Sequence, residues 1–334
     1  MENSWNCNES YEEHKKTLKP WQGILMFLLV MLSFYTIIAW MQGRWGMYGL
    51  ALTELYLLLL SVIGARLLKQ PLRAIFPVKK PEWKKLAAVL LYWISSYALV
   101  IPLTMLVAYF FPEQMFSVSE HMNTFMASVS PFLAVLITSV MPAVCEEAMH
   151  RGFILKCFQS RIKNIWILTI LMGILFGLFH GSIWRFLPTA LLGGVLSYLM
   201  IRTENMIYPA FFHFINNFLP SFLANLAVGI SGNAQTDAAG QQLMEQGLPL
   251  SFLGIYFAMA CIVPFGFYTA DYLLRKGEQG REQHRYLSSN KMLVALVILT
   301  ILPMILGMVL FLYGLFFDSA TLFNNIFKKF LFFY

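Results

Sequence analysis

Ionisable and amide side chains interrupt the apolar stretches of this sequence, and most of them gather between residues 146 and 217. A charge or an imidazole inside a bilayer is expensive unless it is paired or hydrated. Their concentration in one part of the chain therefore indicates a functional site. The side chains that we expect to carry out chemistry there are Glu146, Glu147, Arg151, His180, His213 and Asn217.

The adjacent carboxylates of Glu146 and Glu147 suit acid–base chemistry. On a helix, Glu147 and Arg151 are neighbours at i and i+4 with the acid on the N-terminal side, so Arg151 can hold Glu147 ionised and oriented. Glu146 lies about 100° away around the helix, where it can point into a cavity with no cation to neutralise it. Such a carboxylate suits a general base. The alternative is a helix end at the cytoplasmic surface, where both glutamates would face solvent.

His180 is expected close to Glu146. It ends an apolar run and shares a helical face with Phe176, four residues before it. Glu146 and His180 are each 17 residues from position 163, which lies in the polar turn 160–164. Two antiparallel helices that leave this turn would place both side chains at one depth. The alternative for a histidine at a helix end is an interfacial residue without a catalytic role.

His213 and Asn217 lie one helical turn apart in an aromatic stretch. Paired donors at one spot can stabilise an oxyanion, but the same residues can also form a hydrogen-bonded cluster between helices. Pro209 is typical of a helix start and puts His213 near the inner surface, whereas Glu146 lies about 25 Å from that surface at roughly 1.5 Å per residue. Either the helix of His213 begins earlier, or the helices of Glu146 and His180 are bent.

The composition decides the fold class. Of the 334 residues, 58% are hydrophobic and 12% are charged, and the mean hydropathy is +0.64. Soluble proteins carry roughly 25% charged residues, so this chain cannot cover a soluble surface of its size. That excludes an ordinary cytosolic enzyme, a disordered protein and a nucleic-acid binder. Apolar stretches of about 20 residues instead predict an all-α, polytopic transmembrane helical bundle.

About eight or nine membrane spans are expected. With the N-terminus inside, 20 of the 24 Lys and Arg residues fall in inside segments, which is the bias that sets topology. The sequence therefore predicts an integral membrane protein with a cytoplasmic N-terminus, in a bacterial plasma membrane in preference to a eukaryotic endoplasmic reticulum. The nine apolar spans are residues 21–40, 45–68, 86–111, 131–158, 164–180, 186–201, 207–229, 249–271 and 292–317. We divide the chain into an N-terminal tail (1–20), N-terminal transmembrane helices (21–130), a catalytic core (131–229), and C-terminal helices and tail (230–334).

Taken together, the three motifs resemble those of the CPBP family of intramembrane proteases, which are EExxxR, FxxxH and HxxxN/D on successive membrane helices. Here they stand as Glu146-Glu147-x-x-x-Arg151, Phe176-x-x-x-His180 and His213-x-x-x-Asn217, within about residues 131–220. The resemblance implies that Glu146 activates water with help from His180, that Glu147 and Arg151 support the site, and that His213 and Asn217 bind the oxyanion.

The resemblance also implies a function. Eukaryotic members of the family trim prenylated CAAX proteins, and bacterial members include bacteriocin-processing and immunity proteins. We therefore expect a glutamate-dependent intramembrane endopeptidase whose partners are a membrane-anchored or amphipathic peptide or protein and the lipid bilayer, with no nucleic acid. The cofactor is none or zinc, and the candidate ligands for zinc are Glu146, His180 and His213. Two alternatives stay open: a non-catalytic immunity or scaffold protein on the same fold, and a small-solute carrier, although the sequence has no inverted repeat.

Overall fold

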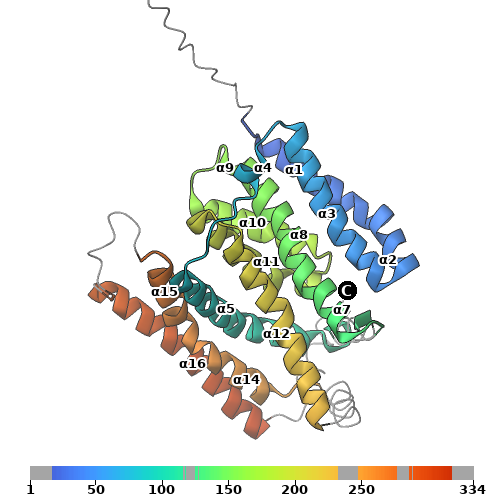
Figure 1. Cartoon of the computed structure of the whole chain (residues 1–334). Coiled ribbons are helices and arrows are strands. Elements are labelled where there is room, and N and C mark those ends of the chain that lie inside the picture. Colours follow the sequence, from blue (N-terminus) through green and yellow to red (C-terminus); the bar gives the residue numbers. More distant parts are fainter. Residues whose placement is uncertain are drawn as a thin grey trace, which may run out of the picture.

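The computed structural model describes residues 17–115, 117, 125–126, 128–231, 247–276, 286–287 and 289–317. Within these ranges all regular structure is helical, and the helices pack side by side as a bundle (Figure 1). Seven of them are long and apolar enough to cross a membrane. The predicted all-α polytopic bundle is therefore confirmed.

The described part of the chain begins with an antiparallel helical hairpin. Helix α1 (Pro20–Ser33), the π-helical stretch η1 (Phe34–Ile38) and α2 (Ala39–Trp45) form one apolar run of 26 residues. Gly46 ends it with a φ of 54°, a conformation that is easy for glycine. Helix α3 (Met47–Leu67) then returns alongside α2.

The helix that carries the paired glutamates is a single run of 29 residues with two π-helical interruptions. Its parts are α7 (Pro131–Val135), η2 (Leu136–Val140), α8 (Met141–Glu147), η3 (Ala148–Ile154) and α9 (Leu155–Gln159). A π-helical turn inside an α-helix is frequent at functional sites because it re-aims the side chains that follow it. Here η3 begins directly after the second glutamate.

Helices α10 and α12 position the other motif residues, and α11 connects them in the chain. Helix α10 (Ile165–Phe179) starts at Asn164, whose side chain accepts hydrogen bonds from two backbone N–H groups of the first turn. Helices α11 (Ile183–Thr203) and α12 (Ile207–Ser231) follow. Helices α10 and α11 lie closely against each other along their length.

Asn205 fixes the position at which α12 begins. Its Oδ1 accepts from the N–H groups of Ile207 at 3.2 Å and of Lys79 at 3.1 Å, and its Nδ2 donates to the carbonyl of Lys79 at 3.0 Å. Lys79 follows the short helix α4 (Leu72–Ile75), which lies between α3 and the next long helix. The start of α12 is therefore held by a segment 126 residues earlier in the chain.

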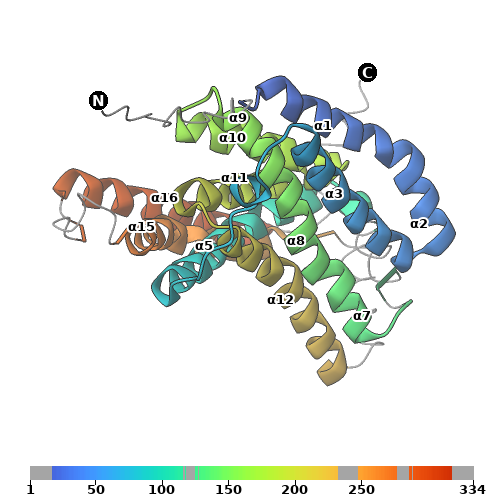
Figure 2. The ribbon, with the colours of Figure 1, turned by 45° about the horizontal axis from the view of Figure 1, so that its top comes forward.

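The remaining helices form the side of the bundle opposite α1–α3, as Figures 1 and 2 show. Helix α5 (Trp83–Phe110) lies against α15 (Val263–Leu274) and α11. Helix α14 (Leu250–Met259) continues through a 3₁₀ turn, η4 (Ala260–Ile262), into α15. Helix α16 (Asn290–Phe317) lies along α14.

The interior consists of two groups of apolar side chains, and α10 contributes to both. One group joins α1, α3, η3 and α9 and includes Met149, Phe153 and Phe179. The other joins α5, α11, α12 and α15 and includes Phe176 and Phe212. Phe176 and Phe179 stack at a centroid distance of 6.3 Å, so the two groups meet beside the end of α10.

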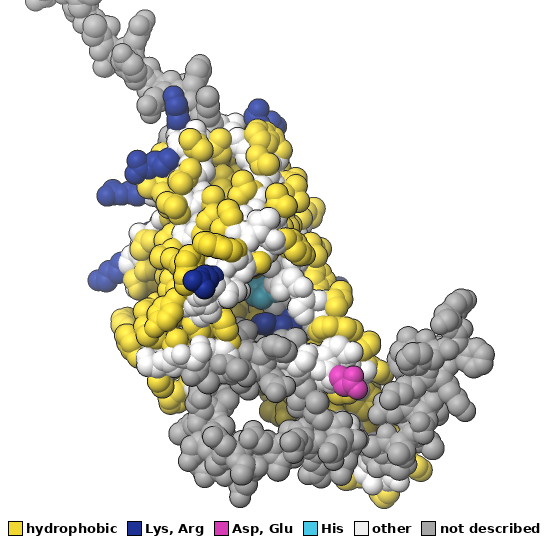
Figure 3. Space-filling model, turned by 90° about the vertical axis from the view of Figure 1, so that its right-hand side faces the viewer, with side chains coloured by type: hydrophobic (Ala, Val, Ile, Leu, Met, Phe, Trp, Pro, Cys, Tyr) yellow, Lys and Arg dark blue, Asp and Glu magenta, His cyan; other side chains and the backbone are white. Residues whose placement is uncertain are grey.

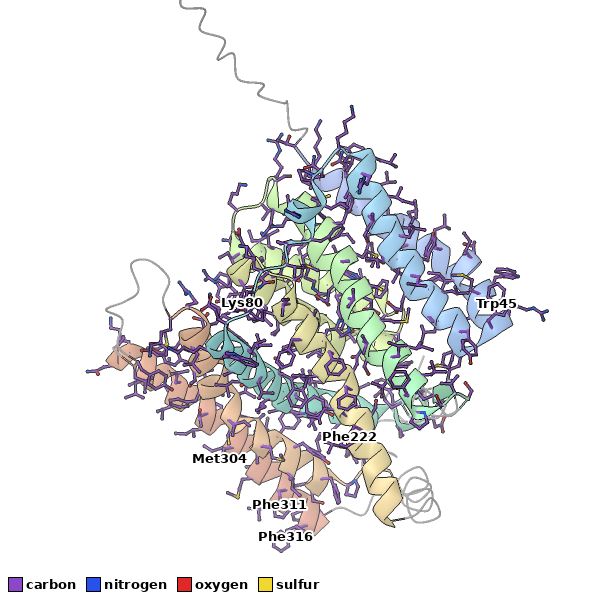
Figure 4. The ribbon with its side chains drawn as sticks, in the orientation of Figure 1. Trp45, Lys80, Phe222, Met304, Phe311 and Phe316 are labelled. Atoms are coloured by element: carbon purple, nitrogen blue, oxygen red, sulfur yellow. The ribbon has the colours of Figure 1, made fainter. Side chains whose placement is uncertain are left out.

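Each of the nine predicted spans coincides with a helix or helical run of the structure. Seven satisfy the length and hydropathy of a membrane crossing; α10, with 15 residues, is shorter, and α12 is not among the seven. Large apolar side chains cover the outside of the bundle, and Figure 4 shows Met304 and Phe316 of α16 and Trp45 of α2 pointing away from it. Soluble monomers do not expose apolar surface on this scale, and a bilayer covers it. The predicted division of the chain into four segments stays a prediction.

Candidate active site

The ion pair expected from the sequence is present and fully buried. Arg151 Nη1 donates to Glu147 Oε1 at 2.9 Å, and both side chains are 0% exposed. The alternative of a helix end with both glutamates in solvent is therefore wrong. Breaking a buried ion pair typically costs several kcal/mol because the remaining charge has no partner.

A second helix completes the surroundings of Arg151. Nη2 donates to the backbone carbonyl of Gly193 on α11 at 3.0 Å, and the guanidinium lies over the ring of Phe176 at 4.4 Å from its centroid. Gly193 permits this approach because a Cβ built there would lie 2.5 Å from Cβ of Phe176. Arg151 thus binds three helices together at the site.

His213 joins the site by its contact with Glu147. Its Nδ1 lies 2.8 Å from Glu147 Oε1, so the carboxylate accepts from both His213 and Arg151. The other ring nitrogen, Nε2, lies 4.0 Å from Glu146 Oε2. Helix α12 begins at Ile207, close to the start predicted from Pro209. An earlier start of this helix therefore does not explain how His213 reaches the depth of Glu146. The helix of Glu146 instead carries two π-helical stretches.

Glu146 is the less constrained of the two glutamates. Its side chain is buried apart from an exposed fraction of 11%, and Oε2 has no hydrogen-bond partner. Among the described residues, no Lys or Arg nitrogen lies within 4.0 Å of its carboxylate, and the one ring nitrogen at that distance is Nε2 of His213. Oε2 of Glu147 is likewise buried without a partner, so the two glutamates differ at the other oxygen: Glu147 Oε1 accepts from two donors, whereas no described residue donates to the carboxylate of Glu146.

His180 follows the last residue of α10 and is the partly exposed one of the three described histidines. Its Nδ1 donates to the backbone carbonyl of Phe176 at 2.8 Å, and its ring meets the Phe176 ring edge-on at 4.7 Å. Phe176 also contacts the His213 ring at 5.9 Å. Figure 3 shows a histidine inside a hollow on one face, with Lys or Arg side chains near it.

Asn217 is placed differently from His213. Its Nδ2 donates to the backbone carbonyl of Thr138 in η2 at 3.0 Å, so it connects α12 to the helix of the glutamates. Its neighbour Asn216 donates to Asn217 Oδ1 at 3.3 Å. The interhelical bridge that the sequence left as an alternative is thus present, and it leaves one N–H of Asn217 for another acceptor.

His150 and Glu54 are the buried groups to which the sequence motifs gave no role. His150 Nδ1 donates to the backbone carbonyl of Glu146 at 3.1 Å, and its ring meets those of Phe176 and Phe179 edge-on. Glu54 on α3 is an electrostatic neighbour of Glu146. The only signal for either residue in the sequence is a titratable side chain within an apolar span.

The zinc candidates do not form a ligand set in the described part of the chain. No three His, Cys, Asp or Glu side chains there lie close enough together to hold one ion. Zinc sites in proteins generally use three or four such ligands at about 2.0–2.3 Å. Glu146, His180 and His213 therefore do not fit zinc as they stand.

Comparisons with known proteins agree with the motifs. Residues 128–219 match the family described as type II CAAX prenyl endopeptidase Rce1-like. The uncharacterized protein YyaK of Bacillus subtilis (strain 168) is 29% identical over 169 residues, which are 47% of this chain and 54% of YyaK. The chain thus spans about half the length of the curated relative it matches, and no solved structure matches it significantly. All six predicted site residues fall inside the matched segment, so the family model and the three motifs point to the same part of the chain and the resemblance to CAAX-type membrane proteases is confirmed there.

Proposed function

We propose that this protein is an intramembrane endopeptidase of the CAAX-protease type in which Glu146 activates a water molecule. The observation that carries the proposal is the difference in hydrogen bonding between the carboxylates of the two adjacent glutamates. Glu147 Oε1 accepts from Arg151 and His213, whereas no described residue donates to the carboxylate of Glu146, whose Oε2 is buried. A carboxylate beside an apolar wall, with an oxygen free, is suited to take a proton from water.

The reaction follows from these positions. Glu146 takes one proton from a water molecule, and the oxygen of that water attacks the peptide carbonyl. The tetrahedral oxyanion that forms needs donors, and His213 and the free N–H of Asn217 are the candidates. Collapse of the intermediate breaks the C–N bond, and the leaving amine takes up the proton from Glu146 or from an imidazole.

His180 is the second imidazole of the proposed site. Because Nδ1 donates to the Phe176 carbonyl, the opposite nitrogen, Nε2, is left to accept from the water or the substrate. Arg151 supports the site from outside the reaction, through Glu147 and Gly193. We assign no reacting role to Arg151 or Glu147.

The substrate class follows from the surroundings of the site. A chain that buries these groups among membrane-spanning helices meets peptides that are themselves membrane-anchored or amphipathic. Prenylated CAAX-type proteins and bacteriocin precursors both belong to this class. The bias of Lys and Arg supports a cytoplasmic N-terminus, and we propose a bacterial plasma membrane as the location.

Cleavage of a membrane-anchored peptide by the purified, detergent-solubilised protein tests the proposal. We expect hydrolysis by the native chain and none by Glu146→Gln, which is nearly isosteric but cannot act as a base. Glu82→Gln is the matched control, because Glu82 is an exposed glutamate that pairs only with Lys85 at the surface. Full activity of folded Glu146→Gln would remove the assignment of that residue.

The same assay separates the other readings. Loss of activity on chelation, restored by zinc, would make Glu146, His180 and His213 ligands in a rearranged site. A scaffold or immunity protein would tolerate Glu146→Gln in its own function and cleave no peptide. A carrier would transport a solute in sealed vesicles without hydrolysis.

A further inference from the structure

Glu54 is a buried carboxyl group that the proposed mechanism does not use. It lies on α3, outside the segment that matches the CAAX-type family. Its side chain is 3% exposed, and its Oε2 has no hydrogen-bond partner. None of the ion pairs within the described ranges involves Glu54. An isolated buried carboxylate is unfavourable enough that its presence requires an explanation.

The packing of α3 brings Glu54 level with Glu146. Helix α3 and the glutamate-bearing helix run side by side in the same direction, as both ribbon views show (Figures 1 and 2). Gly64 of α3 lies against Phe153, since a Cβ built on Gly64 would be 3.0 Å from the Phe153 ring. Ten residues earlier on each helix stand Glu54 and position 143, and Glu146 is within one turn of that position. Glu54 and Glu146 are electrostatic neighbours accordingly.

One negative charge is the stable state of this pair. Two carboxylates in a site of low dielectric do not both ionise readily, because water does not screen their repulsion. The charge is more stable on Glu146, on which Arg151 acts electrostatically, than on Glu54, which forms no ion pair with any described residue. The other charged or titratable groups that act on the pair are Cys145, Glu147, His213 and Arg185.

We propose that Glu54 is a positioning residue that keeps the catalytic base ionised. The two glutamates hold one proton and one negative charge between them, with the proton on Glu54. The O–H group of Glu54 then stabilises the Glu146 carboxylate, directly or through a water molecule. This inference rests on the proposed function, because Glu146 is the base there.

Kinetics of two Glu54 variants test the inference on the full chain, with a membrane-anchored peptide as substrate. Glu54→Leu removes the donor, so we expect kcat to fall about 10–100-fold, as for one lost hydrogen bond to a charged group, with little change in KM. The acidic limb of the kcat–pH profile should move to higher pH by about one unit, because the Glu146 carboxylate loses its donor. Glu54→Gln retains an N–H donor in the same place and should restore most of the activity and the native limb.

A second polar position on the same helix provides the control. Ser61 is buried on α3, and its hydroxyl donates to the carbonyl of Leu57 within its own helix. Ser61→Ala should leave both kcat and the acidic limb unchanged. A role for Glu54 in helix packing alone would lower the melting temperature of Glu54→Leu and leave its pH profile native. An ionised Glu54 would give a limb at lower pH in that variant. Either of these two results overturns the inference.

Infrared spectroscopy separates this inference from the proposed function. The native protein should show the C=O stretch of a protonated carboxyl group, and that band should be lost in Glu54→Gln and kept in Glu146→Gln. This measurement decides the matter if the native protein cleaves no peptide or if Glu54→Leu does not fold. Absence of the band from the native protein, or its persistence unchanged in Glu54→Gln, would overturn the assignment of the proton to Glu54.

Discussion

The imidazole of His213 lies between the two glutamates, with Nδ1 at 2.8 Å from Glu147 Oε1 and Nε2 at 4.0 Å from Glu146 Oε2. A hydrogen bond at one ring nitrogen fixes the ring orientation and the protonation of the other. Arg151 holds the carboxylate that makes this hydrogen bond. Arg151 therefore orients Glu147, and Glu147 orients the His213 ring that faces Glu146. Glu147 needs no contact with the substrate to support the reaction.

Replacing Glu147 by glutamine tests this orientation. Glu147→Gln keeps the shape of the side chain but removes the charge that both donors share. Because the His213 ring loses its fixed orientation, we expect kcat to fall about 10–100-fold, as for the loss of a supporting residue. KM should change little. The melting temperature should fall too, since Arg151 loses its ionised partner. A native kcat in Glu147→Gln would contradict a supporting role, and the exposed Glu82→Gln again serves as the control.

The guanidinium of Arg151 is expected to matter for folding before it matters for activity. Arg151→Ala leaves the Glu147 carboxylate in a buried site with one donor fewer, which should lower the free energy of unfolding by about 3–5 kcal/mol. Arg151→Lys should recover only part of this loss, because lysine cannot donate to Glu147 and to the Gly193 carbonyl in the same planar geometry. Reversible unfolding in detergent gives the measurement. Arg161→Ala, at an exposed position in the α9–α10 turn, should be neutral.

An Arg151→Ala protein as stable and active as the native chain would mean that the arginine only anchors the helix at the membrane surface. Its complete burial makes that outcome inconsistent with the structure.

Local geometry explains what could be predicted from the sequence. Apolar runs locate the membrane helices because burial in lipid requires them, and the predicted spans coincide with helices. The Glu147–Arg151 pair follows from helical periodicity alone. Spacing in the chain predicts one depth for Glu146 and His180 only, and it places His213 nearer the inner surface. The contact of His213 Nδ1 with Glu147 Oε1 across 66 residues of sequence therefore goes beyond what spacing predicts.

Contacts between helices could not be predicted in the same way. The carbonyl of Gly193 accepts from a guanidinium 42 residues earlier, and the carbonyl of Thr138 accepts from Asn217 across 79 residues. Every residue has a backbone carbonyl, so a sequence motif cannot show which carbonyl will accept a hydrogen bond. The π-helical stretches are equally hidden, because they depend on tertiary packing. Glu54 belongs to none of the three motifs, and the register of α3 against Phe153 is what connects it to the site.

Gly193 is expected to be intolerant of a methyl group. In Gly193→Ala the new Cβ would lie 2.5 Å from Cβ of Phe176, so α10 and α11 must separate and the carbonyl that accepts from Arg151 must shift. Overpacking of this kind typically costs about 1–3 kcal/mol, and we expect both the melting temperature and kcat to fall. The matched control is Gly43→Ala in α2, where nothing lies within 4 Å of the added Cβ. That variant should be neutral or slightly more stable, because alanine favours a helix over glycine by roughly 0.5–1 kcal/mol. Equal stability of the two variants would show that α10 and α11 can adjust, and that the close approach at Gly193 is not required.

The pair His213 and Asn217 separates catalysis from helix packing. A donor to the oxyanion acts chiefly in the transition state, so its loss should lower kcat by about 10²–10³ with little change in KM. A bridge between helices instead contributes about 1 kcal/mol of stability. The Asn217–Thr138 hydrogen bond predicts that Asn217→Ala loses stability as well as turnover. His213→Ala should have the larger effect on kcat, because the imidazole can also pass a proton to the leaving amine.

Turnover and melting measured on the same preparations distinguish these contributions. The control is Tyr198→Phe, which removes the hydrogen bond from Tyr198 to Asp271 between α11 and α15 and touches none of the proposed catalytic groups. It should lower the melting temperature and leave kcat native, which sets the scale for a purely structural bridge. Asn216→Ala is a less clean control, since Asn216 donates to Asn217, and we expect it to be intermediate. If His213→Ala and Asn217→Ala both behave like Tyr198→Phe, with full turnover in the folded fraction, the two residues hold α12 in place, and the oxyanion must be stabilised by other groups.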